Sequence, residues 1–247
     1  GLEILDQLED VDAVIVPVGG GGLISGVAFA IKSLKPTCKV YGVQAAGAPS
    51  MANSLHEHHQ ITLDTVSTFA DGIAVKHPGD TTYQMVEKYV DDVVTVSEDE
   101  IAAAILALIE KQKLIAEGAG AVSVAAAMFH KLPLEGKKVV CLISGGNIDV
   151  NILSRVITRG LVMSGRNANL MIALEDKPGQ LQGVSEIVSR CGGNVVSVHH
   201  DRGDTSMSVT SCFLKIGLET RDQAQIDEIR SELTKAGFTL VNERVCM

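Results

Sequence analysis

The sequence contains no tryptophan, and aromatic residues make up only 3% of its 247 residues. A chain so poor in aromatic side chains has little surface on which nucleobases could stack. Basic residues are outnumbered as well, because the formal net charge is −9 and no cluster of lysine and arginine occurs. Anionic surfaces attract basic patches, so we expect neither a nucleic acid nor a membrane as a partner.

Paired cysteines and long apolar runs are also missing. The five cysteines are odd in number, scattered, and never spaced as Cys-x-x-Cys. This pattern is typical of reduced thiols and not of a disulfide framework or a zinc site. No apolar run is long enough to cross a bilayer, and no signal peptide opens the chain. The sequence therefore predicts a cytoplasmic protein.

Apolar residues make up 46% of the chain, which is enough for one large or two modest domains. Up to about residue 163, short apolar strands alternate with helical stretches. The predicted strands are Val14–Val18, Val40–Gln44, Asp92–Val96 and Val139–Ile143, and the predicted helices are Leu23–Leu34, Thr82–Lys88, Glu98–Lys113, Ala119–Phe129 and Val150–Leu161. Such alternation favours an α/β fold, with an open, mostly parallel sheet and flanking helices.

The pattern changes in residues 164–247. Strands are predicted at 170–174, 194–200, 206–216 and 239–245, with helices at 178–188 and 222–235. The order is βαββαβ, which is typical of a ferredoxin-like unit. We therefore predict two domains, 1–163 and 164–247.

Four consecutive glycines, Gly19, Gly20, Gly21 and Gly22, stand between a buried strand and a helix that begins near Leu23. Glycines let backbone N–H groups turn inward, and a helix N-terminus adds further free N–H groups, so the turn suits a phosphate. No Gly-Lys-Ser/Thr follows, which excludes a P-loop, and the dinucleotide pattern is absent. A small monophosphate held by backbone alone fits best. The alternative, a flexible linker, is disfavoured because linkers rarely join a buried strand to an apolar helix.

The stretch Pro17-Val18-Gly19-Gly20-Gly21-Gly22-Leu23 resembles the phosphate loop of pyridoxal-phosphate enzymes of the tryptophan-synthase-β type, also called fold type II. Within them it is most similar to threonine dehydratases (threonine ammonia-lyases) and to serine racemases. The stretch Ser144-Gly145-Gly146-Asn147 resembles a second motif of these enzymes. The resemblance implies pyridoxal 5′-phosphate as cofactor. The residues it implies are, for the phosphate, Gly19, Gly20, Gly21, Gly22 and Leu23; for the pyridine nitrogen, Ser144; and near the cofactor, Gly72, Glu117 and Gly145.

These enzymes attach the cofactor to a lysine in a Ser-x-Lys-x-Arg-Gly-Ala stretch, and this chain contains none. The resemblance therefore implies the C-terminal part of the catalytic region, with no catalytic residue of its own. The implied reaction of the parent enzyme converts L-threonine to 2-oxobutanoate and ammonia, and L-serine to pyruvate. We expect no turnover by the chain alone. The alternatives are a serine or threonine racemase, a β-replacement synthase, or a non-catalytic amino-acid sensor.

No metal site is predicted. Some relatives hold a divalent cation with two carboxylates, but Gln44 and Ser50 stand at those positions here, and neutral oxygens bind hard dications poorly. His56, His58 and His59 form a cluster that is better explained as a solvated loop, since nothing in the sequence fixes them on one scaffold.

The stretch from Leu174 to Leu181 resembles the opening of ACT domains, which are regulatory modules that bind amino acids. The resemblance implies a regulatory site at Asp176, Pro178, Gly179, Gln180 and Leu181, at interfaces between paired domains. Isoleucine or valine is the expected effector, by analogy with feedback control of branched-chain synthesis, and a homodimer or homotetramer is the expected assembly. A βαββαβ fold without any ligand remains the alternative.

Overall fold

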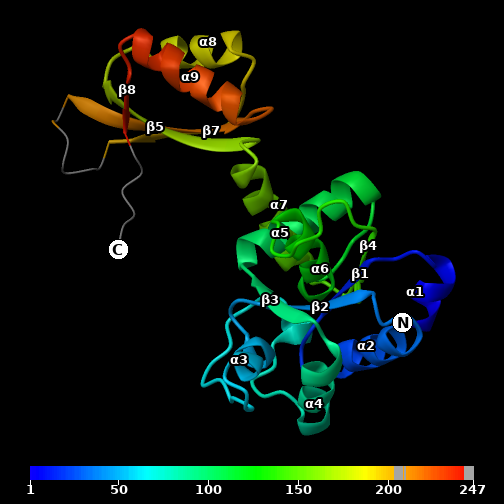
Figure 1. The fold of residues 1–247 in the computed structure, drawn as a ribbon. Helices are drawn as coiled ribbons and strands as arrows, with labels where there is room; N and C mark the ends of the chain where they lie inside the picture. Colours follow the sequence, from blue (N-terminus) through cyan, green and yellow to red (C-terminus); the bar gives the residue numbers. More distant parts are fainter. Residues whose placement is uncertain (203–207, 209, 242–247) are drawn as a thin grey trace. The chain divides into compact units, whose positions relative to one another are not determined.

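The computed structural model describes residues 1–202, 208 and 210–241 (Figure 1). The chain divides into two compact units, Gly1–Ile157 and Thr158–Met247. The boundary falls inside helix α7 (Val150–Met163). Within the described residues, none of the helices combines the length and the apolar character needed to span a membrane.

The first unit contains the predicted open parallel sheet, with strand order β3-β2-β1-β4. Its strands are β1 (Ala13–Pro17), β2 (Lys39–Ala45), β3 (Asp92–Val96) and β4 (Val139–Cys141). Each neighbouring pair runs parallel. The sequence located all four strands, but β4 ends at Cys141, two residues before the predicted end.

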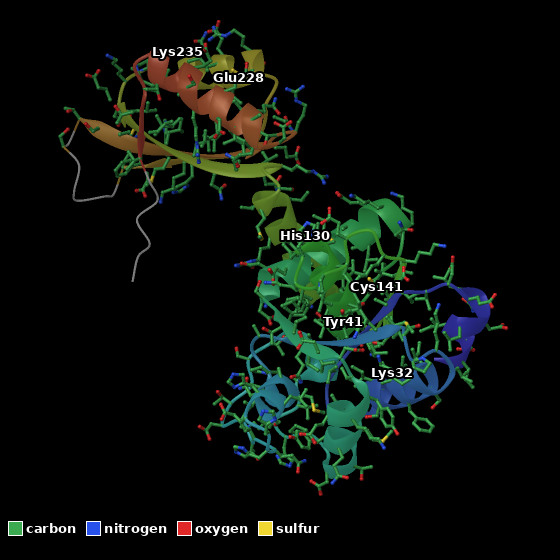
Figure 2. All side chains as sticks on the ribbon, in the orientation of Figure 1. Lys32, Tyr41, His130, Cys141, Glu228 and Lys235 are labelled. Carbon is green, nitrogen blue, oxygen red and sulfur yellow. The ribbon has the colours of Figure 1, made fainter. Side chains whose placement is uncertain are left out.

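Helices cover both faces of this sheet (Figure 1). On one face, α1 (Leu2–Gln7), α2 (Gly22–Leu34), α3 (Ser50–His56) and α4 (Asp80–Tyr89) pack against Val14 and Val16. On the other face, α5 (Glu98–Ala107), α6 (Gly118–Met128) and α7 pack against Ala13 and Ile15. Tyr41 of β2, labelled in Figure 2, belongs to this second cluster. Successive strand residues thus serve opposite faces, as a doubly covered sheet requires.

Two helical details decide where the chain turns near the site. A capping box starts α5, with Ser97 Oγ accepting from the Glu100 N–H and Glu100 Oε2 accepting from the Ser97 N–H. The predicted helix 98–113 is interrupted, because a π-helical turn, η2 (Leu108–Gln112), follows α5 and ends at Lys113 with a φ of 57°. The chain then continues to the start of α6. Earlier in the chain, a 3₁₀ turn, η1 (Asp71–Ile73), lies between α3 and α4.

The second unit has the predicted βαββαβ order and an antiparallel sheet with strand order β6-β7-β5-β8. Its strands are β5 (Asn167–Glu175), β6 (Asn194–Asp201), β7 (Ser211–Glu219) and β8 (Thr239–Val241). Helices α8 (Gln180–Arg190) and α9 (Gln223–Lys235) cover one face through an aliphatic core. Of the predicted strand residues, 206, 207, 209 and 242–245 lie outside the described part of the chain.

Candidate functional site

The two glycine motifs lie at one edge of the parallel sheet. Strand β4 pairs with β1 in the register Ala13↔Val139 and Ile15↔Cys141. Just beyond the paired region, the Leu142 N–H donates to the Ile15 carbonyl at 3.0 Å. Both motifs follow the carboxyl ends of their strands, and this edge is where open α/β sheets place their ligands.

Two carbonyl groups of the glycine run, those of Gly20 and Gly21, accept hydrogen bonds from the protein. The Gly20 carbonyl accepts from Thr82 Oγ1 and, at 3.4 Å, from the Gly79 N–H. The Gly21 carbonyl accepts from Ser25 Oγ at 2.7 Å and from the Ser25 N–H at 3.0 Å. These acceptors therefore face the body of the unit and not the open side of the turn.

The residue before the glycines is held by a buried amide. Gln44 is fully buried, its Nε2 donates to the Val18 carbonyl at 3.3 Å, and its Oε1 accepts from the Ala52 N–H at 2.9 Å. Gln44 thus joins β2, the glycine run and α3. This role requires a side chain that both donates and accepts, as an amide does.

The N–H groups of the same run are in the opposite situation. Among residues 1–202, 208 and 210–241, no acceptor faces the N–H groups of residues 19–23. Helix α2 begins at Gly22 after Gly21, whose φ of 96° is left-handed, and no side chain caps it. Free N–H groups and the positive end of the helix dipole meet at this turn, so it is suited to an anion.

The glycines also divide into packed and open positions. A Cβ atom on Gly19 or Gly21 would come within 3.2 Å or 2.8 Å, respectively, of atoms in other segments. A Cβ atom on Gly20 or Gly22 would meet nothing within 4 Å. Gly19 and Gly21 are thus needed for close packing, whereas Gly20 and Gly22 face unfilled space. The turn thus combines open space with N–H groups that lack a protein acceptor within the described residues, and this combination suits a phosphate.

Three further predicted residues come together beside the run. The Glu117 N–H donates to the Gly145 carbonyl at 3.1 Å, and a Cβ on Gly145 would collide with the Glu117 carboxylate. A Cβ on Gly72 would lie 3.3 Å from Glu117 Oε1. A Cβ on Gly19 would lie 3.4 Å from the Gly72 carbonyl oxygen. Segments far apart in the sequence therefore converge on Glu117, the residue that precedes α6.

Leu23 and Ser144 are both exposed. Leu23 is 45% exposed at the start of α2. Ser144 is exposed too, and within the described residues its hydroxyl has no hydrogen-bond partner. It is therefore available to a ligand.

The sequence did not single out Thr82 and Gly79. Gly79 precedes α4 and Thr82 lies in its first turn, so the contact to the glycine run is made across 62 residues. The only local signal is the Pro78-Gly79 dipeptide before the helix. It indicates where the helix begins but not which atoms the helix side chains contact.

The second unit presents the predicted regulatory turn between β5 and α8. Gly179, with a φ of 91°, precedes α8, and no side chain caps the helix. Pro178 is exposed, and Leu181 is 38% exposed. Asp176 is already engaged, because Arg202 Nη2 donates to its Oδ1 at 2.9 Å. The turn thus combines free N–H groups with a carboxylate that has a counter-ion.

Within the described ranges, no three histidine, cysteine or acidic side chains lie close enough together to hold an ion. His56, His58 and His59 are exposed at and after the end of α3. Ser50 is buried and its Oγ has no hydrogen-bond partner within the described part of the chain.

Known proteins resemble the first unit of this chain, and some of them resemble both units. Residues 1–145 match the family described as pyridoxal-phosphate dependent enzyme. The chain is similar to an L-threonine ammonia-lyase of Thermotoga maritima, with 50% identity over 238 residues that make up 96% of this chain and 59% of that protein. The chain therefore spans about three fifths of the length of this curated relative.

Solved structures resemble the chain over a shorter stretch. The processed form of threonine deaminase isoform 2 from Solanum lycopersicum has 41% identity and a TM-score of 0.61, over 64% of this chain and 47% of that one. A maize serine racemase has 36% identity and a TM-score of 0.58, over 66% of this chain and 50% of that one.

Proposed function

Because the chain belongs to the family of pyridoxal-phosphate-dependent enzymes, we propose that its first unit carries the phosphate-binding and ring-binding part of a threonine ammonia-lyase. The reaction is the conversion of L-threonine to 2-oxobutanoate and ammonia, with L-serine as a second substrate. The observation that carries the proposal is the glycine run: the carbonyl groups of Gly20 and Gly21 accept hydrogen bonds from the protein, while the N–H groups of the run have no acceptor within the described residues. Identity to the Thermotoga enzyme along both units supports the substrate.

The residues at the site fit this cofactor. When bound, pyridoxal phosphate supplies an electron sink that stabilises the negative charge left at the α-carbon of an amino acid. The N–H groups of Gly19–Leu23 bind the phosphate, and the space beside Gly20 and Gly22 receives it. Ser144 offers a neutral hydroxyl to the ring nitrogen. Anchoring the phosphate fixes the ring relative to the substrate.

The lysine that holds the cofactor covalently in this family has no counterpart motif in the given sequence. We expect the purified 247-residue chain to form no 2-oxobutanoate from threonine and no pyruvate from serine. We expect it nevertheless to bind pyridoxine 5′-phosphate, which has the phosphate and ring of the cofactor but no aldehyde. Because the chain has no tryptophan, the fluorescence of this probe can be followed with little background. Measurable oxo-acid formation, or no binding of the probe, would contradict the proposal.

Serine racemization is the second candidate, and it is favoured by the similarity to the maize enzyme. The two reactions can be separated in the protein that contains the lysine by assaying D-serine and pyruvate together from L-serine. A threonine ammonia-lyase gives mainly oxo acid and ammonia.

For the second unit we propose a regulatory site for a small aliphatic amino acid, isoleucine or valine. The free N–H groups before α8 suit the carboxylate, and Asp176 suits the ammonium. The ammonium has to share or replace the Arg202 contact. If the site is built between the second units of two chains, the protein is at least a dimer. A coupling free energy of about 1–3 kcal/mol between this site and catalysis would change activity several-fold. Calorimetric titration with each amino acid, together with the mass in solution, tests this, and a monomer that binds neither would overturn it.

A further inference from the structure

The peptide between Gly20 and Gly21 is oriented from α4. Thr82 Oγ1 donates to the Gly20 carbonyl, and the Gly79 N–H contacts the same oxygen at 3.4 Å. A trans peptide is planar, with its C=O and N–H pointing in opposite directions. Holding the Gly20 oxygen toward α4 therefore directs the Gly21 N–H away from α4.

The hydroxyl has a choice of acceptors. Thr82 Oγ1 also lies 2.9 Å from the carbonyl oxygen of Gly79, the residue that precedes α4. A hydroxyl carries a single proton, so the two carbonyls compete for it. If the Gly79 bond were the only one, Thr82 would act as an ordinary helix-terminus residue. The contact with Gly20 gives it a second role outside its helix.

The Thr82 side chain also limits how the glycine run can move. A Cβ on Gly21 would lie 2.8 Å from Thr82 Cβ and 2.8 Å from Met51 Cε. Gly21, whose backbone is left-handed, therefore packs directly against Thr82 and Met51 and leaves no room there for a side chain. Both the hydrogen bond and the packing therefore act on the peptide whose N–H is directed away from α4.

We propose that Thr82 is a positioning residue for the phosphate site: its hydroxyl holds the Gly20–Gly21 peptide so that the Gly21 N–H points at the phosphate. The inference rests on the proposed function of the glycine run. In this view, a side chain outside the glycine motif pre-organises the phosphate site. Pre-organisation increases affinity by reducing the ordering needed on binding.

The experiment uses the 247-residue chain and pyridoxine 5′-phosphate as the probe. Thr82→Val keeps the branched shape and removes the hydroxyl, and Thr82→Ser keeps the hydroxyl. Thr81→Val is the matched control, because Thr81 is exposed on the same helix and has no hydrogen bond through its side chain within the described residues. Fluorescence titration gives the affinity, and the ³¹P shift of the bound probe reports the surroundings of the phosphate.

We expect Thr82→Val to weaken binding by about threefold to tenfold, as the loss of one hydrogen bond allows, and to move the ³¹P shift. Thr82→Ser should restore both values, and Thr81→Val should change neither. Thermal melts of all variants show whether each is folded. Equal affinity and an unchanged ³¹P shift in folded Thr82→Val would overturn the inference while leaving the proposed function intact. A wild-type chain that does not bind the probe would refute the proposed function itself.

Discussion

Gly20→Asp tests whether the open space beside the glycine run is a phosphate site. A Cβ at Gly20 meets nothing within 4 Å, and its φ is not left-handed, so an aspartate can be accommodated without a clash or backbone strain. The carboxylate would project into the space lined by the free N–H groups. We expect the fold to be kept and phosphate binding to be lost.

The magnitude follows from the separation of the charges. If the carboxylate and a phosphate oxygen share this space at a separation of about 4 Å, their two unit negative charges repel by about 4 kcal/mol at an effective dielectric constant of about 20. A repulsion of this size weakens binding by about a thousandfold. The added side chain also fills part of the space, which acts in the same direction.

The assay is fluorescence titration of the chain with pyridoxine 5′-phosphate. Gly20→Asn is the control, because it has the same shape as aspartate without the charge, and Gly26→Asp carries the charge on an open position farther along α2. Asparagine should bind more tightly than aspartate at residue 20, and Gly26→Asp should stay close to wild type. Wild-type affinity in folded Gly20→Asp would refute the placement of the phosphate.

Three further predictions concern single groups. Gly21→Ala should lower the free energy of unfolding by about 1–2 kcal/mol or more, because the φ of 96° at this residue is left-handed and an added Cβ would meet packed atoms. Urea denaturation measures this change. Under the proposed function the Ser144 hydroxyl contacts the ring and not the phosphate, so Ser144→Ala should keep pyridoxine phosphate affinity within about threefold. The same change should lower turnover in the protein that contains the lysine, and an emptied site would contradict this prediction. Burial raises the pKa of the Asp91 carboxyl, but hydrogen bonds from Lys32 and Lys39 outweigh burial and hold that pKa below its usual value. As the pH falls, the Asp91 carboxylate is therefore protonated in the unfolded chain before it is protonated in the folded one, so the free energy of unfolding decreases below the usual carboxylate pKa. Asp91→Asn should make the free energy of unfolding less dependent on pH in that acidic range.

Much of the fold could be predicted from the sequence because its signals are local. Apolar strands bounded by glycine, and helices with a capping box or a glycine stop, marked the parallel sheet and the βαββαβ order. The exceptions are also physical. Helices α1 and α3 are too short to show a clear apolar period, with 6 and 7 residues. The π turn after α5 keeps helical composition, so only its geometry reveals it.

The candidate site was predictable where a residue's own type carries the information. Glycines in a strand–helix turn indicate an anion site by themselves, and the parallel sheet explains why Ser144 comes to the same edge. Thr82 and Gln44 were not predictable in their observed roles. Their side chains act on the backbone of a distant segment, and neither threonine nor glutamine shows from the sequence which carbonyl it will reach.

The groups that tie down the glycine run all come from the first unit. Ser25 lies on α2, Gln44 on β2 and Thr82 on α4, and each holds a different carbonyl of residues 18–21. The N–H groups are therefore oriented before any ligand arrives. None of these contacts involves the lysine motif of the family. If the glycine run holds the phosphate as proposed, the chain should bind a ring phosphate lacking an aldehyde about as well as the same phosphate with one.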